Sequence, residues 1–216
     1  MTSQVRILIA DDHKILRDGL ESLLQKESTF VVVGTAENGA EAVRLTGELE
    51  PDVLILDIGM PEMNGIDVAR KVRVEFPKVH VIGLSVHTDP LYVERMFQHG
   101  AVGYLPKDCA AEELCNAIRK VVAGGTYIGK SLSDTILRRF AKDPKGRSGP
   151  IDQLSVRERQ VLQLLAEGRS AKDSAERLKI SAKTIEVHRK NIRQKLGIAS
   201  IAELTKYAIR MGITEG

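Results

Sequence analysis

Residues 53–65 read VLILDIGMPEMNG, and this stretch decides the fold of the first half of the chain. Its apolar run at 53–56 predicts a strand that is buried on both faces, because no polar residue interrupts it. The run ends in the carboxylate of Asp57, which is followed by a loop containing Gly59 and Pro61. Ligands and reacting groups collect at the carboxyl ends of strands in open α/β sheets. Asp57 is therefore the first candidate for chemistry, with a loop-capping role as its alternative.

Short apolar runs alternate with amphipathic stretches on both sides of this strand. Strands that alternate with helices form a doubly wound α/β fold, so we expect a five-stranded parallel sheet. Asp89 followed by Pro90 marks the start of one helix, as an N-cap residue and a first-turn proline do. The pattern predicts strands over 5–10, 31–33, 53–56, 80–85 and 103–105, and helices over 16–24, 40–49, 65–75, 89–98 and 110–123.

The second half of the chain has a different organisation. Residues 126–150 have the composition of a linker, in which 131–141 could be helical. Residues 151–216 show no strand pattern and are divided into four short helices, so we expect domains at 1–125 and 151–216, the second small and all-α. The expected helix caps are Ser155 with Glu158, Ser170 with Asp173 and Ser200 with Glu203, and the expected helix stops are Gly168, Gly197 and Gly212.

The net charge of +3 is distributed unevenly between these two halves. Residues 1–125 carry 13 basic and 19 acidic side chains, a net of −6, whereas residues 126–216 carry 19 and 10, a net of +9. A basic domain beside an acidic one predicts a polyanion as partner of the basic half. No apolar run approaches the length of about 18 residues that a membrane helix needs, and the two cysteines match no zinc pattern. We expect a cytoplasmic protein with reduced thiols and no membrane partner.

Charged side chains follow three strands of the predicted sheet. Asp11 and Asp12 come after the first strand, Asp57 ends the third and Lys107 follows the fifth. Parallel strands bring these ends to one edge, where three carboxylates repel one another unless a cation is present. The arrangement predicts a hard divalent cation bound by oxygen atoms, with Mg²⁺ as the expected ion. A lysine opposite that ion suits a carboxylate that becomes phosphorylated, because both cations would neutralise the added charge.

Four short motifs stand out in this half of the chain, namely Asp11-Asp12, LDIGMPEMNG at 56–65, Ser85, and GYLPK at 103–107. As a set they are similar to the receiver domain of two-component response regulators, a flavodoxin-like fold, and the similarity covers about residues 4–123. The resemblance implies that Asp57 accepts a phosphoryl group from a sensor histidine kinase.

The same resemblance implies a role for each residue of the acidic site. Mg²⁺ would be held by Asp12 directly, by Asp11 through water, by Asp57, and by the backbone carbonyl of Gly59. The phosphoryl oxygens would be bound by Lys107 and by Ser85, which would move towards them, after which Tyr104 would swing inward.

Residues 170–196 read as a helix, a short turn and a second helix. A helix with one buried face and an opposite face of Lys and Gln is what a major-groove reader requires. A solvated helix of a bundle is the alternative for this pattern alone. The predicted buried face holds Ile185, Ile192 and Leu196, and the opposite face holds Lys183, Val187, Lys190 and Gln194.

Motifs in this half are similar to the LuxR-type helix-turn-helix, namely LSVRE at 154–158, ISAKTIEVH at 180–188 and NIRQKL at 191–196. A receiver joined to that module resembles the NarL/FixJ family of transcription factors. The resemblance implies a regulator that binds double-stranded DNA and forms a homodimer on phosphorylation, and that is not a multiple-turnover enzyme. It places Lys183, Val187 and Lys190 at bases or nearby phosphates, and Thr184, His188, Arg189 and Lys195 mainly at the DNA backbone.

Three residues of this module are unusual or unexpected. Ala171 and Ser174 stand where the family usually has Asn and an apolar residue, so the first helix of the motif is expected to pack less firmly. Glu186 places a negative charge beside the reading surface, where it could accept from a cytosine amino group or repel phosphate.

Two other classes of function fit part of the sequence. A Mg²⁺-dependent phosphohydrolase would use Asp57 as nucleophile, but Gly59 occupies the position where a general acid would be useful. A constitutive DNA-binding protein would use its first domain only to bind other proteins. Gly59 also offers no side chain to position an attacking water, which leaves His87 as the nearest candidate and predicts a long-lived acyl phosphate.

Overall fold

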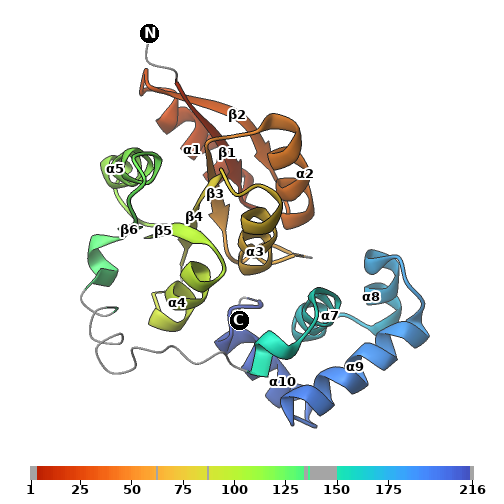
Figure 1. The fold of residues 1–216 in the computed structure, drawn as a ribbon. Coiled ribbons are helices and arrows are strands. Elements are labelled where there is room, and N and C mark those ends of the chain that lie inside the picture. Colours follow the sequence, from red (N-terminus) through yellow and green to blue (C-terminus); the bar gives the residue numbers. More distant parts are fainter. Residues whose placement is uncertain (1–3, 62, 87, 134–135, 137–149, 215–216) are drawn as a thin grey trace. The chain divides into compact units, whose positions relative to one another are not determined.

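The structure is a computed structural model that describes residues 4–61, 63–86, 88–133, 136 and 150–214. The chain divides into two compact units, Met1–Lys145 and Gly146–Gly216. Figure 1 shows that the first unit has strands covered by helices and that the second consists of helices. Within the described ranges, no helix is long and apolar enough to cross a bilayer.

A six-stranded parallel sheet forms the centre of the first unit, in the order β2-β1-β3-β4-β5-β6. The chain adds β2 on one side of β1 and the later strands on the other, which is the doubly wound arrangement. The predicted parallel α/β fold is confirmed, and a sixth strand extends it. The strands are β1 (Val5–Ala10), β2 (Phe30–Ala36), β3 (Val53–Asp57), β4 (His80–Ser85), β5 (Ala101–Pro106) and β6 (Tyr127–Ile128).

Helices cover both faces of this sheet (Figure 1). One face packs against α1 (Lys14–Leu24) and α5 (Ala111–Val122), and the other against α2 (Gly39–Leu49), α3 (Gly65–Glu75) and α4 (Pro90–Gln98). The central strand β3 is buried along its whole length, because its successive side chains point to opposite faces of the sheet and helices cover both faces. Leu54 and Leu56 belong to one hydrophobic cluster, and Val53 and Ile55 to the other.

The sixth strand lies inside the segment that the sequence assigned to the linker. Its two residues pair with Gly103 and Tyr104 of β5. Residues 130–133 and 136 are helical, and both Leu132 and Ile136 are buried in the core beside α4 and β5. A strand of two residues has no periodic pattern, so only its partner in the sheet makes it recognisable. The remaining linker residues, 137–149, lie outside the described part of the chain.

The second unit is a cluster of four α-helices, as the sequence predicted. Predicted stops Gly168, Gly197 and Gly212 adopt left-handed φ values of +76°, +68° and +69°, a conformation that glycine reaches without steric cost. The elements are a 3-10 turn at Pro150–Gln153, α7 (Val156–Ala166), α8 (Ala171–Leu178), α9 (Ala182–Leu196) and α10 (Ile201–Arg210).

Two of the three predicted caps in this unit form. Ser155 and Glu158 make a complete capping box at the start of α7, and the hydroxyl of Ser170 accepts from the backbone N–H of Asp173 at the start of α8. The expected box at Ser200 is wrong, since its side chain makes no capping hydrogen bond. The start of α10 depends instead on burial of its apolar face, which includes Leu204.

Candidate functional site

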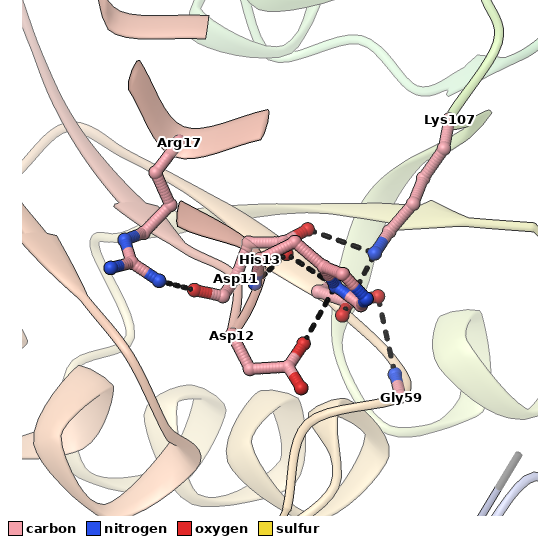
Figure 2. A network of polar contacts seen from close by, with 7 residues as sticks. Asp11, Asp12, His13, Arg17, Gly59 and Lys107 are labelled. Carbon is pink, nitrogen blue, oxygen red and sulfur yellow. Dashed lines mark hydrogen bonds and ion pairs between the residues drawn. The ribbon is translucent and has the colours of Figure 1, made fainter. Parts of the chain in front are cut away.

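The carboxyl ends of β1, β3 and β5 bring two aspartates and one lysine together (Figure 2). Lys107 Nζ lies 2.9 Å from Oδ2 of Asp11 and 2.9 Å from Oδ2 of Asp57. Both aspartates are 1% exposed, so almost no water screens their charges. Both carboxylates face this one ammonium, which offsets only one of their two negative charges. The site therefore has two carboxylate oxygens that a cation or phosphoryl group could engage.

Burial makes ionisation of this site costly. It raises the pKa of Asp57 to about 6, and the neighbouring charge of Asp11 adds to the rise, while Lys107 and the Gly59 backbone N–H oppose it. Burial alone would lower the pKa of Lys107, but the carboxylates of Asp57 and Asp11 together raise it. The lysine therefore carries a positive charge near neutral pH and faces two carboxylates. A further positive charge is what the site would bind most favourably.

The next residues on the loop after β1 complete the acidic group. Asp12 has a side chain that is 33% exposed, and its Oδ1 lies 2.9 Å from Nδ1 of His13. The same Nδ1 lies 3.1 Å from Oδ1 of Asp11, whose Oδ1 also accepts from the His13 backbone N–H at 2.7 Å. The sequence reasoning assigned no role to His13. Its position directly after two aspartates at a strand end was the available signal.

Arg17 is a second residue that the sequence reasoning missed. It lies on α1, is 5% exposed, and donates from Nη1 to the backbone carbonyl of Asp11 at 2.6 Å. Its other amino group pairs with Glu37 at the end of β2. The arginine thereby holds the loop that carries Asp11 and Asp12. Its role depends on the fold, because the Asp11 carbonyl and the Glu37 side chain meet it only there.

These residues fit a divalent cation. Ligand atoms from Asp11, Asp12, His13 and Asp57 all lie within 4.8 Å of one another. Carboxylate oxygens are the ligands that Mg²⁺ prefers, and the two buried carboxylates share one ammonium, which leaves negative charge for a cation. At Gly59, the observed contact is a backbone N–H that donates to Oδ1 of Asp57 at 3.2 Å.

A close backbone approach fixes the loop that follows Asp57. The N–H of Gly65 donates to the carbonyl of Ile58 at 3.0 Å, and a Cβ atom at Gly65 would lie 2.3 Å from the carbonyl oxygen of Asp57. Only glycine fits that space. Asn64 caps α3 immediately before it, with its side chain accepting from the N–H of Asp67. The motif after Asp57 is thus needed for packing as well as for chemistry.

The two predicted switch residues lie side by side. Ser85 ends β4 and is 1% exposed, and Tyr104 in β5 is fully buried. Burial raises the pKa of Tyr104, while its hydrogen bond with Ser85 opposes this rise. Tyr104 therefore occupies the inward position in this structure. The backbone carbonyl of Ser85 accepts from the N–H of Lys107 at 2.8 Å, which links the pair to the acidic site. His87 lies outside the described residues.

Helix α9 has the two faces that its sequence predicted. Ile185 and Ile192 are fully buried, and Leu196 is partly buried against the same core. Ser181 caps the helix by accepting from the N–H of Thr184. The opposite face is open to solvent along its length and holds Lys183, Val187, Lys190 and Gln194.

Two of the other predicted DNA contacts already have partners within the domain. Arg189 pairs with Glu186 at 3.1 Å and donates to the backbone carbonyl of Arg169. Lys195 lies 2.7 Å from Glu158, the glutamate of the α7 capping box. These contacts fix α9 against its neighbours. His188 is partly buried and its Nδ1 atom has no hydrogen-bond partner.

Ser174 replaces an apolar residue in α8 without leaving an unsatisfied group. It is 1% exposed, and its hydroxyl donates to the backbone carbonyl of Ser170 at 2.8 Å. The helix still packs on α9 through Ala175 and Leu178. The expectation of looser packing therefore depends on lost apolar area only.

Comparison with known proteins identifies both units. Residues 7–119 match the family described as response regulator receiver domain, and residues 152–208 match bacterial regulatory proteins of the luxR family. The transcriptional regulatory protein MctR of Rhizobium johnstonii is 36% identical over 210 residues, which is 97% of this chain and 95% of MctR. The chain belongs to the NarL/FixJ family of response regulators. It is a transcription factor with a receiver and a LuxR-type DNA-binding domain.

Other proteins that are similar to this NarL/FixJ regulator are also named as regulators. The oxygen regulatory protein NreC of Staphylococcus aureus is 36% identical over 216 residues, covering 98% of this chain and all of NreC. Among solved structures, a LuxR-family regulator from Aurantimonas has a TM-score of 0.62 at 29% identity, covering 64% of this chain and 99% of that one. A complex of the response regulator RcsB with DNA has a TM-score of 0.59 at 27% identity, covering 95% and 98%.

Proposed function

We propose that phosphorylation of Asp57 by a sensor histidine kinase controls binding of this regulator to double-stranded DNA as a homodimer. The observation that carries the proposal is the pair of buried carboxylates of Asp11 and Asp57, whose Oδ2 atoms both lie 2.9 Å from the ammonium of Lys107. Such a site is short of positive charge and open to a group that brings a cation. We place this chemistry in the cytoplasm.

Mg²⁺ is the expected ion. Asp12 would hold it directly, Asp11 through water, and Asp57 and the carbonyl of Gly59 would complete the protein's share. When bound, Mg²⁺ supplies positive charge that neutralises the phosphoryl oxygens and the crowded carboxylates.

In the transfer step, a carboxylate oxygen of Asp57 forms a bond to phosphorus as the bond from phosphorus to the kinase's histidine nitrogen breaks. The histidine retains the electron pair of that bond. Lys107 is already charged and 2.9 Å from Asp57, so it would meet a phosphoryl oxygen without a large movement. Because the ammonium is held before the reaction, little reorganisation is needed as charge develops.

The phosphoryl group would then change the balance between two arrangements of the receiver. Ser85 would bond one phosphoryl oxygen, and its existing contact with Tyr104 would change as a result. The phosphoryl group shifts the equilibrium only by its different affinity for the two arrangements. The arrangement that binds it better is the one that favours dimerisation.

On DNA, α9 would lie in the major groove with its open face towards the bases. Lys183, Val187 and Lys190 would contact bases or nearby phosphates, while Thr184, His188, Arg189 and Lys195 would position the backbone. For Arg189 and Lys195, this contact would compete with their present partners, Glu186 and Glu158. The last helix, α10, would pair with its twin when two copies bind adjacent half-sites.

The test combines intact mass with a gel shift on promoter-rich DNA, with and without a small phosphodonor plus Mg²⁺. We expect wild type to gain one phosphoryl mass and to bind DNA more tightly, and Asp57→Asn to do neither. A mass gain with unchanged DNA binding would mean that the receiver controls another step. If wild type gains no mass, Asp57 is not the acceptor. Multiple turnover of a small phosphoester would instead favour a phosphohydrolase.

A further inference from the structure

We propose that His13 is a metal ligand at the acidic site, and that it makes the site prefer divalent transition ions with affinity for imidazole over Mg²⁺. The inference rests on the proposed function, because it takes Asp12 and Asp57 to be metal ligands and Asp11 to hold the ion through water. It adds a nitrogen donor to a site otherwise made of oxygen atoms.

The imidazole is directed at the carboxylates. His13 occupies the N-cap position of α1, yet its side chain makes no capping hydrogen bond. Its Nδ1 instead lies 2.9 Å from Oδ1 of Asp12 and 3.1 Å from Oδ1 of Asp11. The backbone N–H of His13 donates to the same Asp11 oxygen at 2.7 Å, which fixes the ring's starting point relative to that carboxylate.

The separation between His13 and Asp12 matches that of two neighbouring ligands of one metal ion. With metal–ligand bonds of about 2.1 Å, neighbouring ligands of an octahedral ion stand about 3.0 Å apart. Nδ1 of His13 lies 2.9 Å from Oδ1 of Asp12, the aspartate that would hold the ion directly. A hydrogen bond from the imidazole would give similar distances, so metal selectivity is the property that distinguishes the two.

The lysine does not occupy this side of the site. Lys107 faces Oδ2 of Asp11 and Oδ2 of Asp57, whereas His13 faces Oδ1 of Asp11, the other oxygen of the same carboxylate (Figure 2). One ammonium faces two buried carboxylates, so the site retains negative charge that the ammonium does not offset. An ion bound beside His13 would therefore share Asp11 with Lys107 rather than displace it.

The nitrogen donor favours one class of ion. Mg²⁺ is a hard cation that takes oxygen ligands and keeps several waters, so an imidazole adds little to its binding. First-row transition ions such as Ni²⁺ and Zn²⁺ bind imidazole well, and their affinities for a mixed N/O site exceed those of Mn²⁺ and Fe²⁺. His13 should thus raise affinity for the second class and leave Mg²⁺ almost unchanged.

The experiment measures Ni²⁺ and Mg²⁺ affinity separately by titration calorimetry on the full chain without an added histidine tag. The variant is His13→Asn, which keeps a hydrogen-bonding side chain at a position that is 61% exposed in the side chain. His80→Asn is the matched control, because His80 is at the amino end of β4 and the acidic site is at the carboxyl ends of the strands. Co²⁺ absorption in the visible range provides a second readout of nitrogen ligation.

We expect wild type to bind Ni²⁺ more tightly than Mg²⁺. His13→Asn should lose about tenfold or more in Ni²⁺ affinity, while its Mg²⁺ affinity stays within about twofold of wild type. His80→Asn should match wild type for both ions. The Co²⁺ spectrum should change only in His13→Asn. Equal losses for both ions, or no loss of Ni²⁺ affinity, would overturn the inference. If wild type binds Ni²⁺ through His13 but does not bind Mg²⁺, the inference stands and the Mg²⁺ part of the proposed function fails.

Discussion

Replacing Asp57 with asparagine should stabilise the receiver when no divalent metal is present. Asp57 is 1% exposed, and burial with the nearby charge of Asp11 raises its pKa from 3.8 to about 6. The folded form therefore binds a proton more tightly than the unfolded form. Wild type loses stability as the pH rises from about 4 through 6, because the buried carboxyl must then ionise. Asparagine has the same shape and never ionises.

The size of the effect follows from that shift. Two pKa units correspond to about 3 kcal/mol, since each unit is worth about 1.4 kcal/mol. That shift already includes the attraction of Lys107 and the Gly59 backbone N–H, which lower the pKa of Asp57. We therefore expect the free energy of unfolding to increase by about 3 kcal/mol at pH 7.5 and by about 1 kcal/mol at pH 4.5, where the unfolded carboxyl is already mostly ionised.

Urea unfolding followed by far-UV circular dichroism in EDTA would measure this, since the chain has no tryptophan. The receiver's transition is the one that Mg²⁺ shifts in wild type, which separates it from that of the second domain. Asp18→Asn, at an exposed position on α1, controls for loss of one carboxylate. A decrease in stability of Asp57→Asn at pH 7.5, or a gain equally large at pH 4.5, would refute the reasoning.

Three other substitutions test other parts of the structure. Lys107→Met should lower the free energy of unfolding of the receiver by about 3 kcal/mol in EDTA, because it leaves two buried carboxylates uncompensated; added Mg²⁺ should restore part of the loss in a thermal melt. Gly65→Ala should destabilise the receiver and slow its mass gain with a phosphodonor, since the new Cβ would lie 2.3 Å from the Asp57 carbonyl oxygen; a variant as stable and as reactive as wild type would contradict this. Lys190→Ala, on the open face of α9, should weaken DNA binding. If Lys190 contacts a phosphate, the slope of log affinity against log salt concentration should become shallower by about one. Lys172→Ala, at an exposed position on α8, is the control.

The sequence predicted the parts of the fold that depend on local pattern. The apolar run ending at Asp57 became a strand buried on both faces, because a continuous apolar run leaves no polar face to present to solvent. Asp89 caps α4 through a hydrogen bond from the N–H of Leu91, with Pro90 in the first turn. These elements form from residues close in sequence, so their signals can be read without knowing the fold.

Features that depend on distant partners could not be predicted. The strand β6 exists because β5 offers it a free edge, and its two residues carry no period of their own. Arg17 on α1 reads as an ordinary surface arginine until the fold brings it to the Asp11 carbonyl and Glu37. Ser200 fits a capping sequence, but the hydroxyl's direction decides whether a bond forms, and sequence does not fix that direction.

A series of contacts connects Asp57 with the segment that leaves the receiver. Lys107, whose ammonium faces Asp57, donates its backbone N–H to the carbonyl of Ser85 at 2.8 Å. The side chain of Ser85 bonds Tyr104, and the carbonyl of Tyr104 accepts from the N–H of Gly129 at 2.9 Å, just after β6. Proximity alone does not couple two sites, because a ligand must bind two arrangements with different free energies. A phosphoryl group that drew Lys107 and Ser85 towards itself would disturb the first members of this series, and β6 is held to β5 over only two residues. The segment after β6 is therefore where such a shift in equilibrium would reach the chain leading to the DNA-binding domain.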